Sequence, residues 1–289
     1  MWVASPDSKL GRAGSVAAAS HVNIRPMWRG YIRRWCVAAA LALGLLGTAR
    51  LTIGPTPSPA APAGPHARPL SGEIVTIDPG HNGGNFTHEQ QISKLVNDGN
   101  GEKECDTTGT AAPDGYRETD FNWDVALRLR ALLRAAGATV TMTRTSNTGV
   151  GPCITERAAI GNRVHSDAAI SIHADGGPPN GSGFAILVPG PIPSRANQTI
   201  IGPSLQFAHA LRTSLLRAGL HTSTYDGVHG IQPRTDLGGL NLSRVPKVFV
   251  EVGNMQNPPD EAPMERPAFR QAVAQALLIG FERFLTGRA

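Results

Sequence analysis

The chain has 289 residues, of which 40% are hydrophobic and 17% charged, and this composition excludes a wholly disordered protein. Its 33 glycines follow no Gly-X-Y period, which excludes a collagen. The net charge of +5 arises in residues 1–70, which hold eight of the 27 basic residues and one of the 22 acidic residues. The remaining residues are close to neutral and give no support for a nucleic-acid-binding surface, so we expect no nucleic-acid partner.

A short apolar segment near the N-terminus follows basic residues, which is typical of an export signal. Arg29, Arg33 and Arg34 precede 13 residues from Trp35 to Gly47. This is shorter than the about 20 residues that a membrane-spanning helix needs. We therefore expect residues 1–50 to be a leader containing a signal peptide, and an uncleaved N-terminal anchor is the alternative. Either form places the protein in the periplasm or cell wall, with membrane contact only through an uncleaved leader.

Residues 51–70 form a different kind of segment, because six of the 20 residues are proline. Such a composition predicts a semi-rigid linker that buries nothing. The folded domain is then expected over residues 71–289.

Within that domain, strand and helix patterns alternate along the chain. We predict strands at Glu73–Asp78, Thr139–Arg144, Ala168–His173, Gly183–Val188 and Lys247–Val252. We predict helices at Asp120–Ala136, Thr155–His165, Ser204–Ala218 and Pro267–Leu285. Residues 79–118 are expected to be a loop insertion. The alternation indicates a single α/β domain with a mostly parallel, mixed central sheet and helices on both of its faces.

Two cysteines lie in this domain, Cys105 inside the insertion and Cys153 outside it. An even number of cysteines in an exported chain favours one disulfide, and two unrelated thiols are the alternative. A bridge would hold the insertion close to the turn that ends at Cys153.

Four polar residues occupy positions typical of a functional site. His81 follows the first strand, His173 ends a later one, Glu251 lies in the strand Lys247–Val252, and Glu118 precedes the first long helix. Functional groups of open α/β sheets gather at the carboxyl ends of the strands. Two imidazoles and one carboxylate suit a catalytic zinc site that keeps one position for water, and a second carboxylate can transfer protons. A single histidine at a strand end is more often structural, so the pattern alone leaves both interpretations open.

Four stretches of the chain resemble, in order, the motifs of the zinc-dependent N-acetylmuramoyl-L-alanine amidases, the third amidase family of peptidoglycan hydrolases. They are IVTIDPGHNGG (74–84), YRETDFNWDVALRLRALLRAAG (116–137), ERAAIGNRVHSDAAISIHADGG (156–177) and VFVEVGNMQN (248–257). The order of the four motifs makes the resemblance specific. The chain is most similar to the short, single-domain form found in mycobacteria.

The resemblance implies a role for each of the four polar residues. His81, Glu118 and His173 would hold one Zn²⁺, and Glu251 would be the catalytic base and acid. Peptidoglycan would be the substrate, cleaved at the amide between the lactyl group of N-acetylmuramic acid and L-alanine. Nothing in the sequence suggests an obligate dimer, so we expect a monomer.

Further residues have less certain roles. We predict substrate contacts for Asn82, Asn257 and His229, of which Asn257 completes the last motif. Asp78 and Asp175 are candidates for the acceptor that orients a metal-binding histidine, and a turn residue is the alternative for each. Arg157 either binds a substrate carboxylate or pairs with a carboxylate inside the fold, and the second alternative is favoured.

Two other functions remain open at this stage. A peptidoglycan-binding module with lost or latent activity is one, and the insertion would cover the groove in its latent form. A zinc peptidase acting on stem peptides alone is the other. The complete set of four polar residues argues against lost activity.

Overall fold

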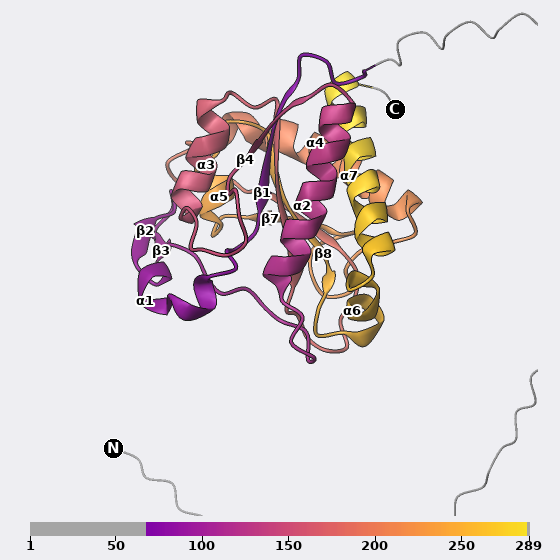
Figure 1. Ribbon diagram of the computed structural model, residues 1–289. Coiled ribbons are helices and arrows are strands. Elements are labelled where there is room, and N and C mark those ends of the chain that lie inside the picture. The colour runs from indigo at the N-terminus through magenta and orange to yellow at the C-terminus, as the bar shows by residue number, and fades with distance from the viewer. Residues whose placement is uncertain (1–67, 288–289) are drawn as a thin grey trace, which may run out of the picture. The chain divides into compact units, whose positions relative to one another are not determined.

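In the computed structural model, which describes residues 68–287, a six-stranded sheet lies between two layers of helices (Figure 1). The strands occur in the spatial order β4-β1-β5-β8-β6-β7. Their bounds are β1 Ile74–Pro79, β4 Thr139–Met142, β5 Ala168–Asp175, β6 Ala185–Pro189, β7 Ile231–Arg234 and β8 Lys247–Asn254. The first four strands in this order are parallel, β6 is antiparallel to β8, and β7 is parallel to β6.

Helices cover both faces of the sheet, as the sequence predicts. α2 (Glu118–Ala135), α4 (Gln198–Arg217) and α7 (Pro267–Thr286) pack together on one face, and α3 (Ile154–Arg163) and the short α5 (Gly238–Asn241) cover the other. Figure 1 shows α2 and α7 on the right of the sheet and α3 and α5 on the left. The prediction of a single α/β domain with a mostly parallel, mixed sheet is confirmed.

The larger core lies between the sheet and the three long helices. α2 contributes Phe121, Val125, Leu129 and Leu133 to it, and these side chains recur every four residues and are fully buried. This spacing places them along one stripe of the helix, which explains why the segment folds against the sheet. The central strands are buried along most of their length because both of their faces are covered.

The predicted elements are all present, with ends that shift by up to six residues. Outside residues 79–118, three further elements appear, namely β7, α5 and α6 (Pro258–Met264). β7 is a four-residue edge strand containing Pro233, and α6 contains three prolines, so neither carries a clear periodic signal.

Residues 79–118 are more ordered than a plain loop. They contain a 3₁₀ turn (Asn85–Thr87), α1 (Glu89–Ile92) and a hairpin of β2 (Leu95–Asn97) and β3 (Glu102–Glu104). The predicted leader and most of the predicted linker, residues 1–67, lie outside the described residues. Within residues 68–287, no helix has the length and apolar character required to cross a membrane.

Buried charges fix the turn that follows β1. The carboxylate of Asp78 accepts hydrogen bonds from Arg157 Nη1 at 2.8 Å and from Lys247 Nζ at 3.0 Å. Arg157 also donates to the carbonyls of Pro79 and His81. Burial alone would raise the pKa of Asp78, but Lys247 and Arg157 hold this pKa well below its usual value. The turn carrying His81 is therefore attached to α3 and β8 by charged side chains.

We expect Gly280→Ala to lower the free energy of unfolding by about 1–3 kcal/mol, because a methyl group there overpacks the contact between α7 and α4. That methyl group would lie 2.5 Å from Leu211 Cδ2 and 3.0 Å from Leu211 Cα. Urea unfolding of the purified variant measures the change.

Gly161→Ala in α3 is the matched control. Its methyl group would lie 3.7 Å from Thr76 Oγ1, which is an ordinary contact. Alanine is the better helix former by about 1 kcal/mol, so this variant should be at least as stable as the wild type. Equal stability of Gly280→Ala and wild type would show that α4 and α7 do not pack this closely.

We expect Asp78→Asn to lower the free energy of unfolding by about 3–5 kcal/mol, because it leaves two buried cations without their carboxylate. The lowered pKa of Asp78 also predicts a pH dependence. Its stabilising contribution is complete above the unfolded pKa of about 4 and is lost as the pH falls below that value.

Urea unfolding at pH 7 and at lower pH measures both effects. Asp236→Asn removes an exposed ion pair and should change the unfolding free energy at pH 7 by about 0–1 kcal/mol. The stability difference between wild type and Asp78→Asn should shrink as the pH falls. A difference that stays constant down to pH 2 would contradict this role of the carboxylate.

Candidate metal centre

Three side chains from separate elements meet at the carboxyl edge of the sheet. His81 follows β1, His173 lies near the end of β5, and Glu118 is the first residue of α2. Because β1 and β5 are parallel neighbours, their ends lie side by side, and Gly80 N donates to Ile172 O across them. One ligand atom from each of the three side chains lies within 4.8 Å of the others.

The glutamate lies between the two imidazoles. Glu118 Oε2 is 3.4 Å from His81 Nε2, and Glu118 Oε1 is 2.8 Å from His173 Nδ1. The backbone N–H of Thr110 and the amide of Asn122 also donate to this carboxylate. The position of the carboxylate is therefore fixed by one donor from the preceding loop and by one from the next turn of its own helix.

The far side of the His81 ring contacts acceptors of its own. Its Nδ1 lies 3.0 Å from the carbonyl oxygen of Thr107 and 3.2 Å from Asp106 Oδ1. A carbonyl only accepts, so Nδ1 carries a proton, and Nε2 is the ring nitrogen that faces Glu118.

His173 is oriented in the same manner. Its Nε2 lies 3.2 Å from Ser171 Oγ, and this hydroxyl donates to Asp78 Oδ2 at 3.1 Å. This contact orients the His173 ring, and its Nδ1 faces Glu118 Oε1. One nitrogen of each imidazole thus faces the same carboxylate, as in the ligand set of a metal ion.

The donor set fits a zinc ion. Zinc binds histidine nitrogen and carboxylate oxygen at about 2.0–2.2 Å in tetrahedral geometry, which separates neighbouring ligand atoms by about 3.3 Å. The 3.4 Å between His81 Nε2 and Glu118 Oε2 agrees with that separation. Glu118 and Asp106 also raise the pKa of His81 to about 10, although burial acts in the opposite direction. The same negative potential favours a metal cation.

Glu251 reaches the site from the neighbouring strand. It lies opposite His173 in the register of β5 and β8. Its Oε2 is buried and has no hydrogen-bond partner among residues 68–287. Burial, followed by the negative charges of Glu118 and Asp175, raises the pKa of Glu251 well above its usual value. This carboxyl group therefore binds a proton more readily than an exposed glutamate does.

Two aspartates have partners that differ from those the sequence suggests. Asp78 pairs with Arg157 and Lys247, and Asp175 Oδ2 accepts from the hydroxyl of Tyr225 at 2.7 Å. Neither is the direct acceptor for a histidine of the cluster, so of the two alternatives for these aspartates the orienting role is not the one observed. Asp106 is the carboxylate that contacts His81 Nδ1.

Among the other candidates, Arg157 is buried and pairs with carboxylates inside the fold, as the favoured alternative states. Asn82 is 1% exposed and bonds Asp106 and Arg157. Asn257 caps α6 and donates to Pro179 O. Both amides are thus used within the protein, and we do not carry their predicted substrate contacts further. His229 is exposed, with a positive φ of 52°.

A cavity of about 160 Å³ adjoins the cluster on the side of α5 and the hairpin. The rings of His81 and His173 line one wall of the cavity, and Phe249 and Leu240 line the apolar part. Phe249 stacks on His173 with 3.7 Å between ring centroids. The imidazole is therefore held by packing as well as by hydrogen bonds.

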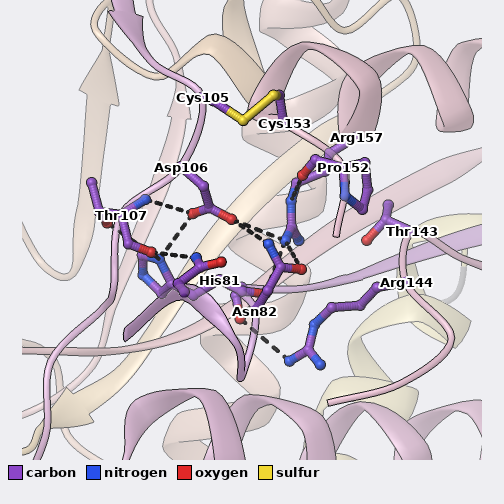
Figure 2. Close-up of polar contacts among 12 residues, drawn as sticks. His81, Asn82, Cys105, Asp106, Thr107, Thr143, Arg144, Pro152, Cys153 and Arg157 are labelled. Atoms are coloured by element: carbon purple, nitrogen blue, oxygen red, sulfur yellow. Dashed lines mark hydrogen bonds and ion pairs between the residues drawn. A yellow bond between two sulfur atoms is a disulfide. The ribbon is translucent and has the colours of Figure 1, made fainter. Parts of the chain in front are cut away.

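The structure joins Cys105 and Cys153 in a disulfide, next to the residues that surround His81 (Figure 2). Asp106 and Thr107 directly follow Cys105, and the sequence analysis did not single them out. The sequence signal that could have identified them is their position directly after Cys105, because its predicted partner, Cys153, lies four residues before Arg157.

Comparison with known proteins identifies the family to which the chain belongs. The chain matches the family described as N-acetylmuramoyl-L-alanine amidase over residues 75–283. It is 43% identical over 217 residues to an N-acetylmuramoyl-L-alanine amidase of Mycobacterium tuberculosis, covering 75% of this chain and 88% of that protein.

Two solved structures have the same fold. The N-acetylmuramyl-L-alanine amidase of Mycobacterium smegmatis has a TM-score of 0.71 at 46% identity, covering 76% of this chain and 99% of that one. The apo form of the enzyme from Mycobacterium abscessus has a TM-score of 0.70 at 45% identity, covering 75% of this chain and 100% of that one. The chain therefore belongs to the N-acetylmuramoyl-L-alanine amidase family of peptidoglycan hydrolases.

Proposed function

We propose that this chain is a zinc-dependent amidase in which His81, Glu118 and His173 hold one Zn²⁺ and Glu251 transfers the protons. The observation that carries the proposal is the cluster in which one nitrogen each of His81 and His173 faces the carboxylate of Glu118, with one ligand atom from each residue within 4.8 Å of the others. The bond cleaved is the amide between the lactyl group of N-acetylmuramic acid and L-alanine of the stem peptide.

When bound, zinc would polarise the carbonyl of the scissile amide and lower the pKa of a water molecule toward neutrality. The protein residues supply the rest of the chemistry. Asp106 and Thr107 keep His81 in one tautomer, and Ser171 orients the ring of His173.

Glu251 performs two proton transfers at one carboxyl group. It accepts the proton of the attacking water and then protonates the nitrogen of the departing L-alanine, because an amine leaves more readily than an amide anion. The buried, unpartnered Oε2 is the atom we assign to both steps. The raised pKa of Glu251 suits both, since the group must accept a proton and also release it.

We also propose where the protein acts. Residues 1–50 direct export, residues 51–70 are the linker, and residues 71–289 are the catalytic domain. The substrate lies outside the cytoplasmic membrane, in the periplasm or cell wall, and an oxidising compartment suits the Cys105–Cys153 bridge. One chain contains all four assigned residues, so a monomer suffices.

We expect Glu251→Gln to lower kcat by about 10²–10⁴-fold and to retain zinc, because the amide keeps the shape of the side chain but cannot accept the proton. Muropeptide hydrolysis measures kcat, and elemental analysis of the purified variant measures zinc. Glu102→Gln changes an exposed glutamate of the hairpin that does not line the cavity and is the matched control, with an expected kcat close to wild type. Full activity of Glu251→Gln would show that another group transfers the protons.

We expect a zinc chelator to abolish activity on muropeptides and added Zn²⁺ to restore it. Mass spectrometry of the products should show stem peptides that begin with L-alanine, together with unsubstituted glycan. Shortened peptides that remain attached to the sugar would instead establish a stem-peptide peptidase. Binding without any product would favour a latent or inactive peptidoglycan-binding module.

A further inference from the structure

His81 has an unusual backbone conformation, with a φ of +53°. Non-glycine residues in this left-handed region need neighbours that hold them there. Arg157 Nη2 supplies one such contact by donating to the carbonyl oxygen of His81 at 2.8 Å. The proposed zinc ligand is thus held at its backbone by one charged residue.

Asp106 holds the side chain of the same histidine. Its Oδ1 lies 3.2 Å from His81 Nδ1 and accepts from the backbone N–H of Thr107 at 2.8 Å. Its Oδ2 accepts from Asn82 Nδ2 at 2.7 Å and from Arg157 Nη2 at 3.2 Å. Figure 2 shows Asp106 at the centre of these contacts. At 6% exposure, the carboxylate is buried with all of its partners supplied by the protein.

The disulfide joins the segment that carries Asp106 to the segment that carries Arg157. Cys105 directly precedes Asp106, and Cys153 is the residue before α3, the helix that carries Arg157. Two backbone hydrogen bonds lie beside the bridge. Ile154 N donates to Cys105 O at 2.9 Å, between the two segments, and Arg157 N donates to Cys153 O at 3.0 Å, within the first turn of α3. The bridge therefore fixes the distance between the segment of Asp106 and the first turn of α3.

We propose that Asp106 is a positioning residue for the metal ligand His81, and that the Cys105–Cys153 disulfide sets the zinc affinity by holding Asp106 against Arg157. This inference rests on the proposed function, because it takes His81 as a zinc ligand. Without the bridge, the loop of Asp106 and α3 separate more easily. The His81 imidazole then samples more orientations and must be ordered again each time zinc binds.

Loss of an orienting carboxylate typically weakens metal binding by about 10-fold to 100-fold. We expect a loss of that size for Asp106→Asn, which keeps the shape of the side chain and the disulfide. We expect a smaller but measurable loss for the double variant Cys105→Ser/Cys153→Ser, in which the carboxylate is present but less well fixed.

The experiment measures the zinc dissociation constant of each variant by competition with a chromophoric chelator. Thermal unfolding in excess chelator measures the stability of the same proteins without zinc. Asp124→Asn is the matched control, because Asp124 also pairs with arginines but lies away from the metal centre, between α2 and α7. It should lower the unfolding temperature and leave zinc affinity unchanged.

A second readout follows His81 directly. ¹⁵N NMR of the imidazole should show the Nδ1–H tautomer in the zinc-bound wild type. In Asp106→Asn, the signal of this ring should broaden or shift, while that of His173 stays unchanged. If the double cysteine variant does not fold, wild-type protein reduced with a phosphine replaces it. The phosphine takes up the oxygen of one water while the disulfide gains two electrons and two protons.

Each outcome decides one point. Unchanged zinc affinity in Asp106→Asn would show that this carboxylate has only a structural role. Unchanged affinity after loss of the bridge, with a lowered unfolding temperature, would show that the disulfide acts on stability alone. Unchanged affinity in His81→Ala would instead overturn the proposed metal site, so failure of the inference and failure of the proposed function are distinguishable.

Discussion

The rest of the candidate metal centre depends on the ion pairs and hydrogen bonds made by the buried guanidinium of Arg157. Its donors reach the carboxylates of Asp78 and Asp106 and the carbonyls of Pro79 and His81. Neither carboxylate would stay ionised in this buried position without a cation beside it. One side chain on α3 therefore stabilises the end of β1, the turn after it and the loop that follows the hairpin.

The topology of the sheet explains why the four assigned residues lie close together although they are far apart in sequence. β1, β5 and β8 are parallel neighbours, so their carboxyl ends lie at one edge of the sheet and present His81, His173 and Glu251 there. α2 begins at the same edge and presents Glu118 from its first turn. The connections between these strands are long, and the loop with Asp106 is part of one of them. The fold thus brings ligands from regular elements and orienting groups from a loop to the same place.

The sequence predicts the regular elements and the four assigned residues because each depends on a local signal. The apolar runs and their periods define the strands and helices, and position at a strand end selects His81 and His173. The contacts of Asp106 could not be predicted in this way. They depend on the path of a loop, and a loop has no periodic sequence pattern from which its path could be predicted. Asn82 shows the converse case: its place beside His81 suggests a substrate contact, but its side chain turns inward to Asp106 and Arg157.

The two glutamates of the site show how position separates the chemistry of identical side chains. Glu118 lies between two imidazoles and accepts backbone and amide hydrogen bonds, and His81 and His173 lower its pKa although burial opposes them. Glu251 lies in an apolar strand with an unpartnered oxygen, and burial and neighbouring carboxylates raise its pKa. An ionised carboxylate is what a metal ligand needs, and a carboxyl group with a raised pKa is what a proton carrier needs. The charge of Glu118 is among the causes of the raised pKa of Glu251, so the proposed metal ligand itself helps to define the proposed proton carrier.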